Sequence, residues 1–382
     1  MTTVAARPGP ADLGAPVRLP WSHLLASWLI ARLLTAVLLV VASPLMAALH
    51  QRRSRHAHGL LGWDASWYDR IATGGYDPLP RLGLRFFPLV PALARGFGVL
   101  LLGHPGLALL LLANGAALLL GVLVHRLAVR CGLGARAAVR AVWATALAPA
   151  GFVLVMGYAE PVWACLVAGF LLALLDRRWQ PAAALGALAA LSRPTGVLIV
   201  IPAAVELVRH RDLALHDLRR RDLRPLLPVV APAAALLAWL AVVGARYGDP
   251  LLPFRAQADQ SLRGGLLVDP LPMVADGLRA LPADVLPVVT HLPWVLLSLL
   301  LLAVAARRLP LSLTLYAAAS LALALTAARF SSYERYAGTT VPLLLAAGAA
   351  TRHRLPRWGL TTAAVATFST YAVLALAGTA TP

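Results

Sequence analysis

Residues 105–125 read PGLALLLLANGAALLLGVLVH, a stretch with no carboxylate and no arginine. About 20 such residues wound into an α-helix cross the roughly 30 Å of bilayer hydrocarbon. Apolar stretches recur along the rest of the chain, and this recurrence predicts an all-α polytopic membrane protein. The other stretches are residues 22–49, 88–103, 137–156, 160–176, 180–191, 196–208, 225–247, 290–306, 310–328, 338–351 and 357–378.

The composition excludes a soluble globular enzyme, a disordered protein and a fibrous repeat. The 382 residues are 60% hydrophobic and 13% charged, whereas soluble domains carry roughly 25% charged residues. All 34 basic residues are arginine, and the net charge is +18. These arginines lie between apolar stretches, so they indicate membrane orientation and lipid phosphate rather than nucleic acid. Two cysteines, Cys131 and Cys165, form no disulfide or metal framework, and we expect no metal.

Arginine clusters in short connections orient the spans. Under the positive-inside rule they are cytoplasmic, which places the N-terminus inside and predicts about 11 transmembrane helices. Residues 1–20 are expected to be a disordered cytoplasmic N-terminus, and residues 21–382 a single transmembrane domain. The clusters lie at residues 126–140, 177–178, 209–224, 307–308 and 352–357.

The same topology assigns the connections of the opposite side. Residues 50–87 form the first outer loop and residues 248–289 the second. Residues 88–103 are expected to be re-entrant or juxtamembrane, without crossing. The stretches 180–191 and 196–208 are expected to cross as two short helices joined by an outer turn at residues 192–196.

Unusual polar residues gather on this outer face, in turns far apart in sequence. They are Asp64 in the first outer loop, Glu160, Arg193, and the turn from Arg329 to Tyr336. Charges at this depth are costly unless they are paired or functional. We therefore expect these turns to converge at one site.

Each of these residues also has a purely structural interpretation. Asp64 caps an interfacial helix, or it is a base whose partial desolvation sharpens its basicity. Glu160 complements a helix dipole, Arg193 snorkels, and the turn around Ser332 is plain loop. His50, His56 and His58 are most simply a solvated loop, because no cysteine or acid completes a ligand set.

The chain resembles the PIG-V-type mannosyltransferases, a family that includes the second mannosyltransferase of GPI-anchor synthesis. The first-loop signature is carried by Trp63-Asp64, Trp67-Tyr68, Ile71-Ala72, Gly75-Tyr76 and Phe86-Phe87-Pro88. Three later segments are similar to further family motifs: Tyr158-Ala159-Glu160-Pro161, Ser192-Arg193-Pro194-Thr195-Gly196 and Ser331-Ser332-Tyr333-Glu334-Arg335-Tyr336. Ala159 departs from the pattern, because the family usually has a hydroxyl there.

The resemblance implies a C-type glycosyltransferase fold and inverting transfer of a sugar from a polyprenyl-phosphate carrier on the non-cytoplasmic face. We expect Asp64 to be the catalytic base. Arg193, with Arg335 or Arg329, is expected to hold the lipid phosphate. Glu160 orients hydroxyl groups or holds Arg193. The remaining substrate-binding candidates, some of which could instead anchor the loop, are Trp63, Trp67, Tyr68 and Ser332.

The expected partners are a polyprenyl-phosphate-mannose donor, an extracytoplasmic glycan, lipid or protein acceptor, and membrane lipids. No cofactor is expected, and the expected location is the plasma membrane with the site outside. Three alternatives stay open: a transporter or flippase for a lipid-linked sugar, a C-type transferase that uses another sugar such as arabinose, and a non-catalytic membrane partner of a cell-envelope complex.

Overall fold

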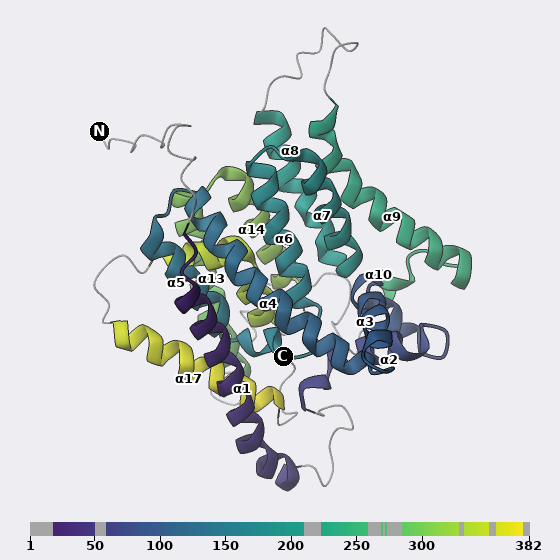
Figure 1. Ribbon diagram of the computed structural model, residues 1–382, viewed down its shortest axis with the longest axis horizontal. Helices are drawn as coiled ribbons and strands as arrows, with labels where there is room; N and C mark the ends of the chain where they lie inside the picture. The colour runs from purple at the N-terminus through teal and green to yellow at the C-terminus, as the bar shows by residue number, and fades with distance from the viewer. Residues whose placement is uncertain are drawn as a thin grey trace.

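The computed structural model describes residues 18–49, 59–209, 223–258, 269, 272, 285–327, 332–350 and 357–376. Every regular element within these ranges is a helix (Figure 1). The all-α polytopic membrane fold is therefore confirmed. Residues 1–17, the three histidines at positions 50, 56 and 58, Arg329, and most of the 248–289 loop lie outside the described residues.

Four helices in the described ranges are long and apolar enough to cross a bilayer. These spans are Trp21–Ala42 in α1 (Trp21–Leu49), α4 (Pro105–Arg130), Arg224–Tyr247, which contains α9 (Leu227–Tyr247), and His291–Arg308 in α13 (Val285–Arg308). Shorter apolar helices complete the bundle: α6 (Glu160–Leu175), α14 (Leu311–Leu325), α16 (Val341–Ala350) and α17 (Arg357–Leu376).

Proline breaks two of the expected spans. The stretch 137–156 was expected to be continuous, but it divides into α5 (Ala135–Leu147) and the short η4 (Gly151–Leu154). Ala148 is extended there because Pro149 follows it and disfavours the helical conformation. The break thus corrects the prediction of one continuous helix.

The second break falls where it was expected. Helix α7 (Trp179–Ser192) ends at Ser192, and η5 (Pro194–Ile199) leads into α8 (Val200–Arg209). The residue between them, Arg193, is extended with φ −156° and ψ 152°, because it precedes Pro194. The predicted break between two short helices is confirmed, whereas their crossing and the outer position of the turn stay predictions.

Helix α3 (Leu89–Leu100) has 12 residues, a length of about 18 Å, which is too short to cross the hydrocarbon. It packs beside α2 (Asp64–Gly74) and α10 (Leu252–Gln257) at one end of the bundle (Figure 1). Arg95 of α3 donates a hydrogen bond of 2.9 Å to the carbonyl of Thr73 in α2. The length and these contacts agree with the expectation that residues 88–103 do not cross, which stays a prediction.

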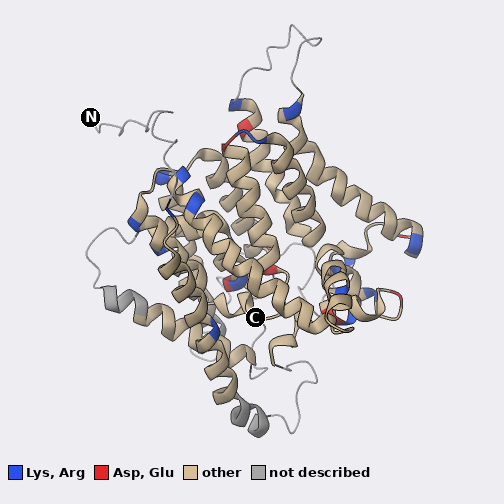
Figure 2. Cartoon of the chain, in the orientation of Figure 1, with Lys and Arg blue, Asp and Glu red and all other residues tan. Residues whose placement is uncertain are grey.

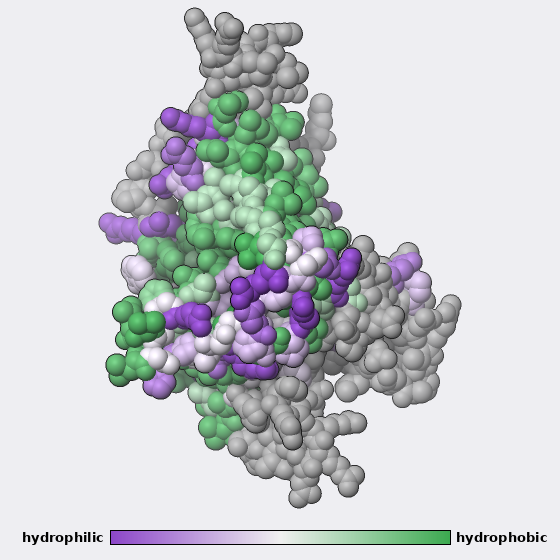
Figure 3. All heavy atoms as spheres, turned by 90° about the vertical axis from the view of Figure 1, so that its right-hand side faces the viewer, coloured by the Kyte–Doolittle hydropathy of each residue, from purple (hydrophilic) through white to green (hydrophobic). Residues whose placement is uncertain are grey.

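The surface is that of an integral membrane protein. Charged residues gather at the ends of the helices, whereas the helix flanks are almost free of them (Figure 2). Figure 3 shows a broad hydrophobic area next to a band of hydrophilic residues. Large apolar side chains of α9 are among those exposed, with Leu237 64% and Val230 57% exposed. Such flanks suit lipid rather than water.

Helix α6 lies at the centre of the bundle, between α4 and α7 (Figure 1). Twelve of its 16 residues are buried, which leaves it no lipid-facing stripe. The buried core continues into α4 and α5 and includes Phe152 and Phe170. Glu160 begins this central helix, so its carboxylate is carried into the interior of the protein.

Candidate active site

Asp64 is the first residue of α2, and its side chain does not cap that helix. Its Oδ2 instead accepts a hydrogen bond of 2.7 Å from Nη1 of Arg335, which lies in α15 (Tyr333–Thr339). Its Oδ1 lies 3.8 Å from Nη2 of Arg85. The Asp64 side chain is 27% exposed. The carboxylate therefore lies between two guanidinium groups and stays partly exposed at the protein surface.

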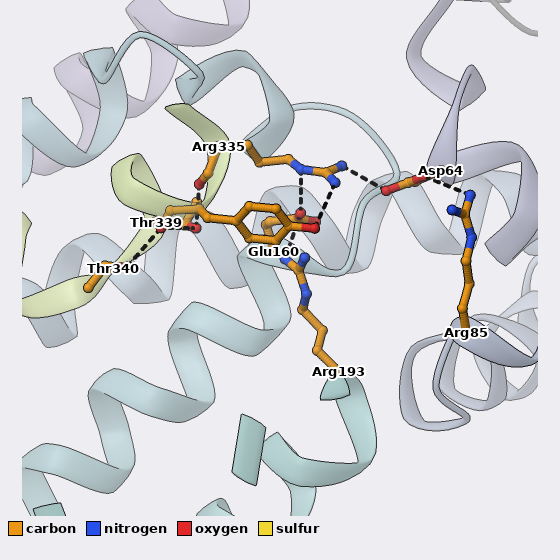
Figure 4. A network of polar contacts seen from close by, with 8 residues as sticks. Asp64, Arg85, Glu160, Arg193, Arg335, Thr339 and Thr340 are labelled. Atoms are coloured by element: carbon orange, nitrogen blue, oxygen red, sulfur yellow. Dashed lines mark hydrogen bonds and ion pairs between the residues drawn. The ribbon is translucent and has the colours of Figure 1, made fainter. Parts of the chain in front are cut away.

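Glu160 is 1% exposed and lies between two arginines. Its Oε1 is 2.6 Å from Nη1 of Arg193 and 3.2 Å from Nε of Arg335. Arg335 thus bridges both carboxylates, Asp64 on one side and Glu160 on the other (Figure 4). The site brings together four of the residues predicted from sequence, and Arg85 joins them unforeseen.

Arg193 is positioned by the helix break described above. Because α7 stops at Ser192, the Arg193 side chain leaves the chain at the break and enters the interior, where the residue is 8% exposed. It pairs with Glu160 rather than reaching for the membrane surface. The snorkelling interpretation is therefore wrong.

Gly196 makes the same break possible, because its turn packs directly against α7. A Cβ atom at this position would lie 2.0 Å from the carbonyl oxygen of Ala189. We expect Gly196→Ala to destabilise the protein by about 1–3 kcal/mol and to displace Arg193 from Glu160. The measurement is thermal unfolding of the purified protein.

Gly115→Ala is the matched control for this substitution. Gly115 lies within α4, and a Cβ there meets nothing within 4 Å. This control is expected to be neutral or slightly stabilising, because alanine favours helix over glycine. An unfolding temperature for Gly196→Ala equal to that of Gly115→Ala would contradict the packing argument.

Aromatic rings frame the two inner arginines. The Arg193 guanidinium lies 5.4 Å from the Trp163 ring and 5.2 Å from the Tyr336 ring. The Arg335 guanidinium lies 5.4 Å from the Tyr158 ring and 5.2 Å from that of Tyr336. Stacked rings keep a guanidinium in place without neutralising its charge. Tyr158 and Tyr336 belong to the sequence motifs described above, but no role was predicted for them, and Trp163 was not predicted at all.

Backbone strain is stored at two residues that immediately precede the site helices. Trp63, before α2, has φ 54°, and Ser332, before α15, has φ 59°. A positive φ at a non-glycine residue costs on the order of 1–3 kcal/mol of conformational free energy, and residues strained in this way cluster at functional sites. The strain orients the first turns that carry Asp64 and Arg335.

The contacts of the two predicted tryptophans favour loop anchoring. Trp63 donates a hydrogen bond of 2.9 Å from Nε1 to the carbonyl of Ala375 in α17. Trp67 stacks on Phe86, with ring centroids 5.6 Å apart. Tyr68, 5% exposed, meets Phe86 edge to face at 5.1 Å. Burial raises the pKa of the Tyr68 phenol, which lies in the field of Arg193, so it stays neutral.

Ser332 is 8% exposed and accepts a hydrogen bond of 3.2 Å from the Tyr336 amide at its carbonyl. Its substrate-binding role stays a prediction, as does that of Arg329, which lies outside the described residues. The turn itself is not plain loop, because α15 begins at Tyr333.

Two opposing effects set the charge state of Asp64. Burial raises the pKa of its carboxyl, but the guanidinium groups of Arg335 and Arg85 outweigh burial and leave the pKa below its usual value. The expectation that desolvation sharpens the basicity of Asp64 is therefore wrong for the protein without substrate. The carboxylate is instead kept ionised.

A hydrogen-bond network between α1, α4 and the end of η4 supports the segment that leads to this site. Arg32 of α1 donates hydrogen bonds to Asn114 Oδ1 at 2.8 Å and to the Leu154 carbonyl at 3.1 Å. Asn114 in turn donates one of 3.0 Å to the carbonyl of Val155. These bonds satisfy the carbonyls that the end of η4 leaves free, and they fix the segment that leads to Tyr158 and Glu160.

A small cavity lies beside Arg193. Two rings that frame this guanidinium, those of Trp163 and Tyr336, also line the cavity. Of the six other lining side chains, three are apolar and three carry a hydroxyl group. These lining residues are Thr195, Leu198, Ser320, Leu323, Ala324 and Thr340. The Arg193 guanidinium and this small cavity thus share two aromatic rings.

No family model and no curated protein matches the chain. Among solved structures, it is similar to ArnT from Cupriavidus metallidurans bound to undecaprenyl phosphate, with 18% identity, a TM-score of 0.52, and 92% of this chain and 76% of that chain covered. The Archaeoglobus fulgidus oligosaccharyltransferase with a tethered acceptor peptide shows 14% identity and a TM-score of 0.48, covering 95% of this chain and 56% of that one. The likeness to ArnT shows that the chain has the fold of C-type membrane glycosyltransferases.

Proposed function

We propose that the protein is an inverting glycosyltransferase that moves mannose from a polyprenyl-phosphate carrier to an acceptor on the extracytoplasmic face of the plasma membrane. The observation that carries the proposal is the bridge that Arg335 forms between Asp64 and Glu160. It joins a candidate base to a candidate phosphate site within a few ångströms. The neighbour with the same fold was solved with undecaprenyl phosphate bound.

The charges of the cluster suit the donor. Three guanidinium groups face two carboxylates, so the cluster keeps one positive charge. A sugar linked to a lipid through phosphate is a phosphodiester with one negative charge, which restores neutrality. Guanidinium groups bind phosphate oxygens in bidentate geometry.

The reaction then needs one proton acceptor. Asp64 takes the proton of the acceptor hydroxyl as that oxygen bonds to the anomeric carbon. The bond between this carbon and the phosphate oxygen breaks at the opposite face, which inverts the configuration. The carrier phosphate leaves with the electron pair of that bond, and Arg193 and Arg335 stabilise the charge that develops on it.

Mannose is chosen because of the first-loop resemblance to the PIG-V-type enzymes. The test uses the purified full-length protein with polyprenyl-phosphate-[¹⁴C]mannose, the arabinose analogue and candidate acceptors. Mannose-specific release and transfer support the proposal, and arabinose-specific release corrects the sugar. Movement of an intact donor across vesicles without release of sugar identifies a flippase instead.

The lowered pKa of Asp64 makes a prediction about pH. An aspartate with an ordinary pKa of about 3.9 is fully ionised above roughly pH 5, and the pKa of Asp64 lies below the ordinary value. Activity is therefore lost only as the pH falls through this low value. We expect kcat/KM for the donor, at saturating acceptor, to be flat between about pH 5 and 8. An acidic limb with a midpoint near pH 6.5 would point to histidine as the base.

A further inference from the structure

Helix α15 presents a second polar group on another face. Glu334, the neighbour of Arg335, is 6% exposed and faces α13 and α17. Its Oε1 lies 2.6 Å from Nδ1 of His291 in α13 and accepts a hydrogen bond of 3.4 Å from the Tyr371 hydroxyl in α17. The site described above uses none of these three residues.

The remaining polar atoms of this pair make no hydrogen bond within the described residues. The His291 side chain is 22% exposed, and neither its Nε2 nor the Glu334 Oε2 has a hydrogen-bond partner in the part of the chain that the structure describes. An imidazole Nε2 either donates or accepts a hydrogen bond, and a free carboxylate oxygen accepts one. Trp294 lies beside the pair, with its ring centroid 6.0 Å from that of Tyr371.

Short covalent and hydrogen-bonded paths connect this pair to the candidate base. Glu334 precedes Arg335, which binds Asp64. Tyr371 and Ala375 lie four residues apart on α17, hence on one face. Tyr371 contacts Glu334, and the Ala375 carbonyl binds Trp63, the residue before Asp64. The pair and the base therefore lie around the same short helix.

We infer that His291 and Glu334 form an acceptor subsite that binds the hydroxyl groups of a sugar ring. This inference rests on the proposed function, in which Asp64 takes the proton of the reacting hydroxyl. An imidazole nitrogen and a carboxylate oxygen beside an indole ring suit a ligand with several hydroxyl groups and an apolar face, because each hydroxyl both donates and accepts. A sugar ring carries several O–H groups next to one apolar face, whereas the N–H donors of a peptide are spaced along its backbone, so we take a glycan or glycolipid rather than a protein as the acceptor.

A purely structural role is the competing explanation, and Ser298 provides the matched control. Its hydroxyl lies on α13, like His291, and bonds to the hydroxyl of Tyr333 on α15. Loss of a simple attachment between α13 and α15 is expected to affect Ser298→Ala and His291→Ala in the same way. Loss of an acceptor contact affects only His291→Ala and Glu334→Gln.

The experiment measures transfer from polyprenyl-phosphate-[¹⁴C]mannose to octyl α-mannopyranoside, to a serine-containing peptide and to water. We expect His291→Ala and Glu334→Gln to raise the KM for octyl mannoside by about tenfold or more, the effect of one hydrogen bond to a polar or charged group. The donor KM and mannose release to water are expected to stay unchanged in both variants, and Ser298→Ala is expected to match the wild type.

Several results would overturn the inference. An unchanged KM for octyl mannoside in both variants would do so, as would a parallel loss of transfer and of release to water. The inference would also be contradicted if the wild-type protein transferred mannose only to the peptide. It would be contradicted too if the wild-type protein released mannose to water but transferred none to octyl mannoside. A wild-type protein that releases no mannose under any condition would instead refute the proposed function, and this inference with it.

Discussion

Asp64→Asn is expected to lower the turnover of mannose transfer by about 10²- to 10⁴-fold, the usual contribution of a general base. Asparagine keeps the size of the side chain, and its carbonyl oxygen accepts the hydrogen bond that Arg335 now donates to Oδ2. Arg335 also keeps its contact with Glu160. The fold and the carrier site are therefore retained while the proton acceptor is lost.

The measurement is kcat with saturating donor and acceptor, and binding of undecaprenyl phosphate reports the intact carrier site. Asp77→Asn is the matched control. Asp77 lies in the same outer loop and pairs with Arg246, but both side chains are more than half exposed. The control is expected to keep wild-type turnover. Near wild-type turnover of Asp64→Asn would refute the assignment of Asp64 as the base.

The fold was largely predictable because bilayer crossing leaves a direct record in the sequence. Apolar length and arginine placement separate spans from connections, and Pro194 marks the break at Arg193. Pro149 breaks the expected span of 137–156 by the same mechanism, which a search for apolar length alone overlooks. Proline after an apolar stretch is therefore as informative as the stretch itself.

The convergence of Asp64, Glu160, Arg193 and Arg335 was predictable for a related reason. Unpaired charge is costly at this depth, so distant charged turns on one side of the membrane must find one another. Their exact pairing was not predictable, because it depends on helix rotation and on the strained turns before α2 and α15. Trp163 was missed because one more tryptophan in an apolar helix carries no distinguishing signal.

The two carboxylates of the cluster differ in burial, which separates their roles. Glu160 is almost fully enclosed between Arg193 and Arg335, whereas the Asp64 side chain is 27% exposed. An enclosed carboxylate with two guanidinium partners holds those partners in place, and only the exposed one is within reach of an incoming hydroxyl. If the phosphate of the lipid-linked sugar binds Arg335, it competes with Asp64 for the same guanidinium group. Its arrival weakens the pairing that lowers the Asp64 pKa and so makes Asp64 a stronger base when substrate is bound.

Arg193→Lys is expected to weaken binding of undecaprenyl phosphate by about 10- to 100-fold. Lysine keeps a positive charge beside Glu160, so the carboxylate 2.6 Å away keeps a partner and the protein folds. The planar fork that binds two phosphate oxygens is lost, and so is the stacking between Trp163 and Tyr336. One hydrogen bond to a charged group is worth about 1.5–3 kcal/mol, which gives the expected range.

Arg193→Ala is less informative, because it leaves Glu160 with a single buried partner and costs stability of about 3–5 kcal/mol for a broken buried pair. The binding constant of undecaprenyl phosphate is therefore measured on Arg193→Lys and compared with Arg246→Lys. Arg246 is 61% exposed in its pair with Asp77, and its replacement by lysine is expected to leave carrier binding unchanged. Equal affinities of the two variants would show that the phosphate is held elsewhere. A selective loss at Arg193 would place it between the broken helix and α15.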